Sequence, residues 1–258
     1  MKKFFLMASM LLSSHLIAQA AEQFVKFSAP QQDALLLTGS NDTIRYAHNE
    51  WKGVMMAVEN LRNDLRAVTG SDKAPIVVAT IGKSEMAKKY PRQCKQLKGK
   101  WEKFLIFTDN GSLVVLGSDK RGTIYGIYEL SRQIGVSPWY WMADAPISRH
   151  DKIYVLPGTY TDGEPKVKYR GIFINDEWPS FGGWCSNKFG GINSKAYRHI
   201  FELLLRLKAN YFWPAMWGSN FNEDDPESPR LADEMGIVMG TSHHEPMMRS
   251  HREYTKRK

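Results

Sequence analysis

The sequence predicts an α/β protein in which a small N-terminal α/β domain precedes the beginning of a larger, parallel α/β domain. Up to about residue 160, short apolar strands alternate with helices of 3.6-residue period. Gly, Pro and polar residues then gather in a predicted linker, Thr159–Lys166. Beyond it, strand and helix candidates alternate, as in a parallel sheet covered by helices. We therefore predict domains at residues 21–160 and 167–258.

The first 20 residues are typical of a cleaved secretory signal peptide. Lys2 and Lys3 provide a basic start, Phe4–Ile17 is a mostly apolar run, and the small residues Ala18 and Ala20 fit a peptidase site. The run is shorter than the ~20 apolar residues that cross a bilayer. We expect a periplasmic or secreted protein with no membrane association after cleavage.

The composition is that of an ordinary globular chain, with 43% hydrophobic and 24% charged residues. The net charge of +8 becomes +6 when Lys2 and Lys3 leave with the signal peptide. The basic residues look spread along the chain and no nucleic-acid motif accompanies them. We therefore expect no nucleic acid partner, and a charge that provides solubility and also suits an anionic substrate. Cys94 and Cys185 can pair or stay free, and their spacing does not decide between these states.

The small domain is predicted to contain an amphipathic helix, a buried strand, a hairpin and a second helix. The apolar stripe of the first helix consists of Trp51, Val54, Met55, Val58, Leu61, Leu65 and Val68. A glycine then stops the helix, and 74–81 has the pattern of a buried strand. The hairpin lies at 103–116 around an Asn-Gly turn. The second helix, 121–134, carries Gly122 and Gly126 on one face, which permits close packing on a sheet.

The second domain is predicted to begin a (β/α)₈ barrel. Strand candidates lie at 170–175, 209–213 and 236–241, and helical sequence separates them at 195–207 and 228–235. A complete barrel needs ~250 residues, whereas 92 residues remain from position 167 onward. Three of the eight units therefore fit, and we predict a truncated, incomplete barrel.

In such barrels the functional side chains follow the carboxyl ends of the strands. The first predicted strand leads into Asn175, Asp176 and Glu177. Neighbouring carboxylates can bind sugar hydroxyls or transfer protons, and glycosidases use paired carboxylates as acid and base. The alternative is a solvated loop with a helix cap. All three residues are candidates for substrate binding, and Asp176 and Glu177 are also the candidates for catalysis.

Four aromatic residues lie within seven positions, in and just after the second predicted strand. A serine and an asparagine follow them. Flat apolar faces beside hydroxyl and amide groups suit a sugar ring. Phe212 and Trp213 are interpreted as core residues. Trp217 and Asn220 lie beyond the strand and are candidates for substrate binding.

The third predicted strand is followed by His243, His244 and Glu245. Adjacent side chains on an extended chain point to opposite faces, and the spacing differs from the H-E-x-x-H helix that places two metal ligands on one side. We therefore predict no metal site. One histidine, together with Glu245, is expected to face the cleft, either as a hydrogen-bonding partner of the substrate or as a group that orients another side chain. The other histidine is interpreted as a packing residue.

Three motifs in this order resemble the opening barrel strands of glycoside hydrolase family 115, the xylan α-glucuronidases. They are Lys168–Glu177 (KYRGIFINDE), Ala209–Trp217 (ANYFWPAMW) and Thr241–Met247 (TSHHEPM). The preceding domain carries two further motifs of the same kind, Ser118–Gly126 and Gly135–Trp141. The resemblance covers nearly the whole chain after the signal peptide.

The resemblance implies an inverting hydrolase that removes α-1,2-linked glucuronic acid, or its 4-O-methyl ether, from glucuronoxylan without a cofactor. Inversion requires a general acid and a general base ~6.5–9.5 Å apart, and the identity of both stays open. Family members are several times longer, so we expect this chain alone to be inactive. Lys120 and Arg121 would contact the uronate carboxylate only if their loop reached the cleft, which is not expected.

Two other functions remain open at this point. A hexosaminidase-like glycosidase also places a small α/β domain before a barrel, but its neighbouring Asp-Glu pair would lie on a later strand than this chain contains. Outside the enzymes, the alternative is a non-catalytic remnant that binds carbohydrate.

Overall fold

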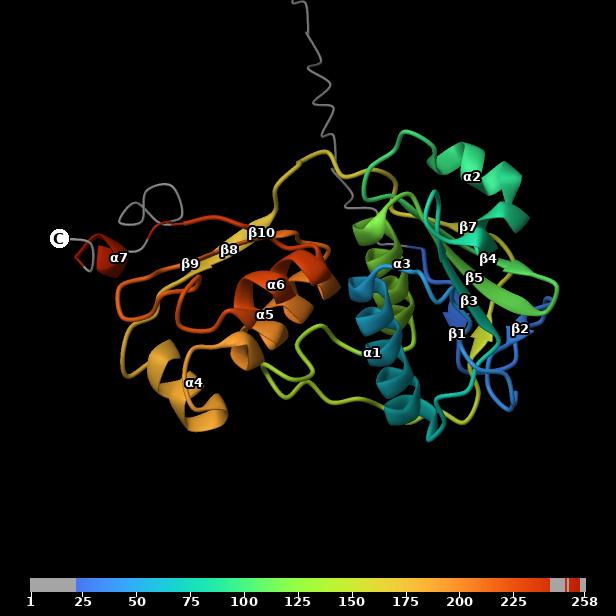
Figure 1. Ribbon diagram of the computed structural model, residues 1–258. Helices are drawn as coiled ribbons and strands as arrows, with labels where there is room; N and C mark the ends of the chain where they lie inside the picture. The colour runs from blue at the N-terminus through green and yellow to red at the C-terminus, as the bar shows by residue number, and fades with distance from the viewer. Residues whose placement is uncertain (1–21, 242–248, 250, 256–258) are drawn as a thin grey trace, which may run out of the picture.

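The computed structural model describes residues 22–241, 249 and 251–255, and it stacks four layers of secondary structure (Figure 1). A mixed sheet packs on helices α1 (Lys52–Thr69) and α3 (Lys120–Gln133). Helices α5 (Ser194–Arg206) and α6 (Glu227–Met235) pack against that pair, and a parallel sheet follows. No helix in this described part combines the length and the apolar composition needed to cross a membrane. The predicted signal peptide lies outside the described residues.

The mixed sheet has the strand order β3-β5-β4-β7. Strands β3 (Ile76–Thr80) and β5 (Ser112–Gly117) are parallel, whereas β4 (Phe104–Asp109) is antiparallel to both β5 and β7 (Thr159–Tyr160). Every residue of β3 and β5 is buried, because helices cover both faces of the sheet. The predicted strand at 74–81 and the predicted hairpin are both confirmed.

The backbone conformation of the hairpin turn explains why the turn consists of asparagine and glycine. Asn110 and Gly111 both have a left-handed backbone, with φ of 43° and 71°, and this conformation matches the twist of two strands joined by a two-residue turn. The sequence interpretation placed Thr159 and Tyr160 in the linker, but their pairing with Phe107 and Ile106 makes them part of the sheet. Two paired residues are too short to leave a periodic signal.

The face of the mixed sheet opposite α1 and α3 carries elements that the sequence did not reveal. The short 3₁₀ helix η1 (Glu85–Lys89) and helix α2 (Pro91–Leu97) pack there in a separate hydrophobic cluster. A small antiparallel sheet with the order β1-β6-β2 lies beside the main one, from Val25–Lys26, Tyr154–Val155 and Leu35–Leu36. Each of these strands has only two residues, so no alternation could predict it.

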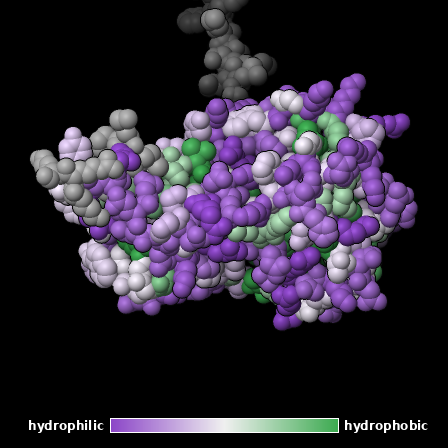
Figure 2. Space-filling view, viewed as in Figure 1, coloured by the Kyte–Doolittle hydropathy of each residue, from purple (hydrophilic) through white to green (hydrophobic). Residues whose placement is uncertain are grey.

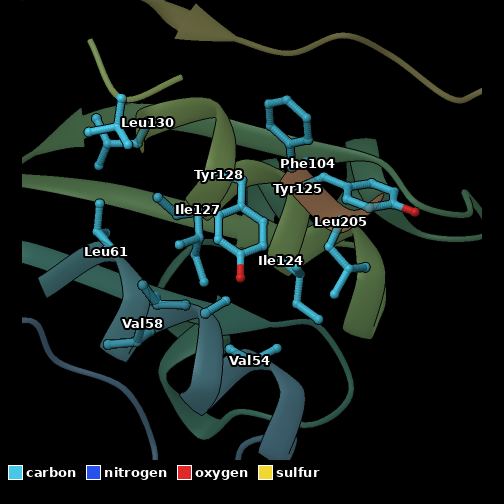
Figure 3. Close-up of a cluster of buried hydrophobic side chains, with 14 of the residues drawn as sticks. Val54, Val58, Leu61, Phe104, Ile124, Tyr125, Ile127, Tyr128, Leu130 and Leu205 are labelled. Carbon is cyan, nitrogen blue, oxygen red and sulfur yellow. The ribbon is translucent and has the colours of Figure 1, made fainter. Parts of the chain in front are cut away.

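Helix α3 lies close against the sheet because it carries glycines where side chains would collide. A Cβ atom on Gly126 would lie 2.7 Å from Val115 and one on Gly122 would lie 2.4 Å from the carbonyl oxygen of Lys103. The sequence prediction for these two positions is confirmed. Figure 3 shows the core that results, in which side chains of α1 and α3 meet Phe104 of β4 and Leu205 of α5.

The second part of the chain forms a three-stranded parallel sheet. Its order is β10-β9-β8, with β8 (Gly171–Ile174) and β10 (Val238–Met239) on either side of β9 (Tyr211–Pro214). Helices α5 and α6 connect the strands, as predicted, and helix α4 (Phe181–Phe189) was not predicted. A short helix, α7 (His251–Thr255), follows. The described residues thus form an α/β protein with a mixed sheet, a small antiparallel sheet and a parallel sheet, and the incomplete barrel stays a prediction.

Both cysteines are free thiols. Cys94 lies on α2 and is half-buried, whereas Cys185 lies on α4 and is fully buried. Burial raises the pKa of both thiols, that of Cys185 to about 11. The two cysteines, whose pairing the sequence left open, are therefore unpaired in the structure.

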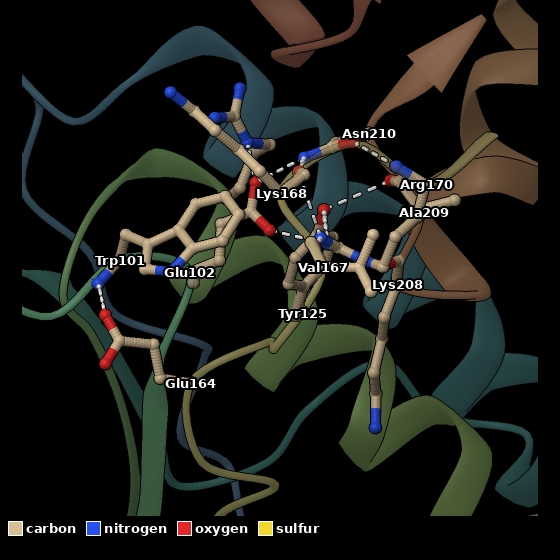
Figure 4. A network of polar contacts seen from close by, with 12 residues as sticks. Trp101, Glu102, Tyr125, Glu164, Val167, Lys168, Arg170, Lys208, Ala209 and Asn210 are labelled. Atoms are coloured by element: carbon tan, nitrogen blue, oxygen red, sulfur yellow. Dashed lines mark hydrogen bonds and ion pairs between the residues drawn. The ribbon is translucent and has the colours of Figure 1, made fainter.

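Glu102 joins the two parts of the chain (Figure 4). Its side chain is fully buried and accepts hydrogen bonds from Arg121 on α3, from Arg170 at 2.5 Å and from Asn210 at 2.7 Å. Arg170 directly precedes β8, and Asn210 directly precedes β9. A single carboxylate thus fixes the amino ends of two parallel strands to the first part of the chain.

A second buried contact connects α1 with α5. The guanidinium of Arg206 donates two hydrogen bonds to Asp64, at 2.9 and 3.0 Å, and a third to Glu202 at 2.8 Å. It also lies 4.7 Å from the centre of the Tyr128 ring. Burial acts to lower the pKa of Arg206, yet the neighbouring carboxylates raise that pKa above its ordinary value. Because all three charges are buried, they depend on one another for solvation.

We predict that Asp64→Asn lowers the free energy of unfolding of the chain by roughly 3 kcal/mol, since it leaves part of the buried Arg206 charge without its partner. Glu202 remains as one acceptor, which keeps the loss at the lower end of the usual range. The matched control is Glu227→Gln, which removes an exposed ion pair with Arg230 and should cost less than ~1 kcal/mol. Urea unfolding measures both values, and equal losses in the two variants would contradict the prediction.

Candidate active site

The carboxyl ends of β8 and β9 lie side by side and form the candidate site. The amide of Ala215, just after β9, donates a hydrogen bond of 2.9 Å to the carbonyl oxygen of Ile174, the last residue of β8. The two loops that follow therefore start from one edge of the parallel sheet. This edge is the place where parallel α/β folds present their functional groups.

Asp176 fastens these two loops together. Its Oδ2 atom accepts hydrogen bonds from the Gly218 amide at 2.6 Å, the Ser219 amide at 2.8 Å and the Ser219 hydroxyl at 3.0 Å. The residue is only 3% exposed. Its other oxygen, Oδ1, is buried without a hydrogen-bond partner among the described residues. Asp176 is therefore a loop anchor with one unused acceptor.

The neighbours of Asp176 in sequence point elsewhere. Asn175 and Glu177 are both exposed, because successive side chains diverge on an extended chain. Trp178 and Trp217 are 66% and 76% exposed and stand at the same edge. The edge therefore combines a free carboxylate, an amide and two indole rings. Such a set can bind a sugar through its hydroxyl groups and its apolar ring faces.

Asn220 shapes its loop instead of facing solvent. It is 1% exposed, its amide donates to Asp224 at 2.7 Å, and its side-chain oxygen accepts from the Asn222 amide at 3.2 Å. Its place beyond the strand suggested a binding residue, but the Asn side chain is bonded within its own turn. Substrate binding by Asn220 therefore stays a prediction that this geometry does not favour.

Tyr197 on α5 supports the same loop, although no motif in the sequence marks it. Burial raises the pKa of its hydroxyl well above the ordinary value. Its ring packs edge-on against Phe212 of β9 and Phe221. Tyr197 lies on the apolar face of a helix, where an aromatic residue is expected for packing alone.

The two aromatic residues interpreted as core lie on opposite faces of β9. Phe212 is fully buried against α5, as expected. Trp213 is half-buried on the other face, where its ring centre lies 5.9 Å from that of Phe173 and 5.4 Å from that of Tyr211. The alternation of side chains along a strand separates them, so Trp213 does not belong to the core between sheet and helices.

Lys120 and Arg121 lie at the opposite end of the parallel sheet. Lys120 donates to the carbonyl oxygen of Asp233 at 2.6 Å, and Arg121 donates to that of Gly236 at 3.0 Å. Both acceptors precede β10, so these cations lie near the amino ends of the strands. As expected, they are not part of the candidate site.

His243, His244 and Glu245 lie outside the described residues, so their place in the site stays a prediction. Within the residues that the structure does describe, no group of three or more His, Cys, Asp or Glu side chains is arranged to hold a metal ion.

Two family models match parts of the chain. Residues 162–258 match the model of glycosyl hydrolase family 115. Residues 15–130 match the model of the N-terminus of glycosyl hydrolase family 67. No curated protein matches the sequence significantly.

Solved structures resemble the chain over most of its length. One is BtGH115A, described as a family GH115 4-O-methyl-α-glucuronidase with specificity for decorated arabinogalactans; it is 36% identical, with a TM-score of 0.75. The match covers 84% of this chain and 30% of that protein. The Flavobacterium johnsoniae chitobiase FjGH20 is 14% identical, with a TM-score of 0.51 over 90% of this chain and 36% of its own, which shows a shared fold alone.

We predict that Asp176→Asn speeds amide hydrogen exchange at Gly218 and Ser219 by about 10- to 100-fold. The Asp176 carboxylate accepts hydrogen bonds from both amides, and a hydrogen bond to a charged group contributes ~1.5–3 kcal/mol to stability. Hydrogen exchange followed by mass spectrometry reports such local opening. The control is Glu177→Gln, which changes the neighbouring exposed carboxyl group and should leave these amides unaffected. Equal exchange in wild type and Asp176→Asn would show that Asp176 does not anchor the loop.

Proposed function

The chain is related to glycosyl hydrolase family 115, as its motifs predicted, and from this premise we propose that it supplies the first part of an exported α-glucuronidase. The proposed reaction removes α-1,2-linked glucuronic acid, or its 4-O-methyl ether, from glucuronoxylan with inversion of configuration. The observation that carries this proposal is the edge of β8 and β9, which presents exposed Glu177 and two exposed tryptophans, Trp178 and Trp217, within the segment that matches the family.

The chain spans 30% of the length of its solved family 115 relative. The proposed enzyme therefore includes further barrel strands that complete the site. We also propose that residues 1–20 direct export and are then removed, and that residues 21–160 and 167–258 are separate domains. The basic start, the apolar run and the small residues at positions 18 and 20 support the export proposal.

A second polysaccharide is also a candidate for the polymer that carries the glucuronic acid. BtGH115A is described as specific for decorated arabinogalactans, and it is 36% identical to this chain. The glucuronic acid unit is the common element of the two polymers in these proposals. Hydrolysis of glucuronoxylan and of a glucuronic acid-bearing arabinogalactan, compared side by side, distinguishes the two substrates.

We propose different roles for the two neighbouring carboxylates. Asp176 holds the Gly218-Ser219 loop through one oxygen, and its buried second oxygen can accept one hydrogen bond more. Glu177 is exposed and can meet the substrate directly. Inversion needs a second carboxyl group ~6.5–9.5 Å from the first, with a water molecule between. His243, His244 and Glu245 are proposed to complete the substrate contacts from the third loop.

We predict that the purified 258-residue chain releases no glucuronic acid from glucuronoxylan above a buffer blank. The parallel sheet ends at β8 and β10 without further strands in the described residues, and one of its faces presents partly exposed aromatic side chains. Such an edge can hold only part of an acid and base pair. Reducing-sugar analysis after prolonged incubation measures the release, and a positive result would contradict the need for further strands.

In a full-length enzyme that contains these residues, we predict that Glu177→Gln lowers kcat/KM by about tenfold, mainly through KM. This is the effect of losing one hydrogen bond between a charged group and a substrate hydroxyl, ~1.5 kcal/mol. A fall in kcat of ~10²–10⁴ would instead assign proton transfer to Glu177. Steady-state kinetics of Glu177→Gln and Asp176→Asn separate these roles, and wild-type activity in both would exclude this edge from the site.

A further inference from the structure

A groove lies at the carboxyl ends of β3 and β5, in the first part of the chain. These strands are parallel neighbours. The chain leaves β3 toward η1 and α2 on one face of the sheet, whereas it leaves β5 toward α3 on the opposite face. In open sheets, adjacent parallel strands with helices on opposite faces leave a crevice outside their carboxyl ends, and ligands bind in such crevices.

The groove is large and its lining is both apolar and basic. Its volume is about 830 Å³, within the range of small-molecule sites. Ile81, Ala87 and Pro91 provide apolar surface. Four lysines also line it: Lys83, Lys88, Lys95 and Lys98. Glu85 is the single acidic residue in the lining.

The net charge of the chain is concentrated around this groove. Residues 83–103 contain eight basic and two acidic residues, whereas the rest of the chain after residue 20 contains 25 of each. The expectation that the basic residues are spread evenly is therefore wrong, because the whole excess of +6 comes from one segment of 21 residues. Figure 2 shows hydrophilic side chains beside green hydrophobic ones where α2 lies, at the upper right of the molecule.

Three of the groove lysines are free to bind an anion. Lys88 pairs with Glu85 at 2.6 Å. Within the described residues, Lys83, Lys95 and Lys98 have no acidic side chain within 4 Å. Each therefore keeps an ammonium group with unused donors beside the same crevice.

An aromatic side chain extends the groove. The ammonium group of Lys83 lies 4.5 Å from the centre of the Trp51 ring, and that of Lys120 lies 5.5 Å from it. Trp51 is 41% exposed at the start of α1. Its flat apolar face beside two cations suits a ring that carries a carboxylate.

We propose that this groove is an accessory binding site for uronic acid residues of an acidic polysaccharide. Lys83, Lys95 and Lys98 bind the carboxylates, and Trp51 stacks on a sugar ring. The choice of a uronic acid rests on the proposed function. The site itself lies on a different sheet from the β8 and β9 edge, so it binds the polymer without taking part in hydrolysis.

The local geometry favours a carboxylate-bearing sugar over phosphate. The amide of Met86 at the start of η1 is occupied by the Ser84 hydroxyl, at 3.3 Å. The Gly122 amide at the start of α3 is occupied by the carboxylate of Asp119, at 2.8 Å. Phosphate sites commonly combine such free amides with lysine or arginine side chains, and these two amides are already used within the fold.

Affinity electrophoresis of the 258-residue chain in gels containing glucuronoxylan tests the proposal. We expect Lys83→Gln/Lys95→Gln/Lys98→Gln to raise the dissociation constant by at least tenfold and Trp51→Ala to raise it about fivefold. The control Lys73→Gln/Lys152→Gln/Lys166→Gln removes the same number of positive charges elsewhere on the chain. It should change the dissociation constant by less than about twofold. Unchanged thermal midpoints verify that every variant folds.

Further probes identify the ligand chemistry. The same glucuronoxylan with its carboxyl groups reduced to alcohols should lose at least tenfold in affinity. Inorganic phosphate at roughly 10 mM, well below the ~0.15 M physiological ionic strength at which general screening sets in, should not compete. The proposal would be overturned if the reduced polymer bound as well as the unreduced one, or if the two triple variants lost equal affinity. Competition by phosphate, or tighter binding of an oligonucleotide, would also overturn it. None of these outcomes bears on hydrolysis at the barrel edge, which the kinetics of the full-length enzyme test separately.

Discussion

The buried carboxylate of Glu102 is the constraint on which the arrangement of the whole chain depends. Its backbone is left-handed, with φ of 51°, a conformation that costs energy for any residue but glycine. The strain is offset because the Glu102 amide bonds to Asp119 at 2.7 Å while its side chain reaches Arg121, Arg170 and Asn210. One residue thereby links the start of α3 to the amino ends of β8 and β9.

This junction decides which surfaces remain available for function. The ion pair of Glu102 with Arg170 and that of Asp64 with Arg206 both lie on the side of the parallel sheet that faces α1 and α3. A single hydrophobic core then runs from β3 and β5 through four helices to Phe212 of β9. The core reaches the loop after β9 through Met216 and Phe221, whereas Glu177, Trp178 and Trp217 stay exposed at the carboxyl ends of the strands. These exposed positions can vary in sequence with little effect on the fold.

Periodicity was sufficient for the elements with a strong pattern and failed where function or tertiary contact determines the structure. The Asn110-Gly111 turn and the glycines of α3 each have a local physical reason, and the structure has both. Five of the seven residues in the predicted apolar stripe of α1 are buried, whereas Met55 is half-buried and Trp51 is exposed just before the helix. Asp176 and Glu177 were found as neighbours, but their opposite exposure depends on the Gly218-Ser219 loop, 42 residues away. No local pattern could reveal the contacts of Glu102, because its partners come from three separate segments, at 119–121, 170 and 210.

The lysine groove and the β8–β9 edge follow from one topological rule applied to two sheets. In each case parallel strands end side by side, and the loops beyond them carry the exposed polar and aromatic groups. The edge presents the exposed carboxylate of Glu177 and the exposed Trp178 that follows it, whereas the groove holds the ammonium group of Lys83 beside Trp51. A carboxylate suits sugar hydroxyls and proton transfer, and an ammonium group suits the anionic side of the same sugar. Because the Glu102 junction fixes the two sheets relative to each other, a long acidic polymer bound at the groove is held at a constant position relative to the edge.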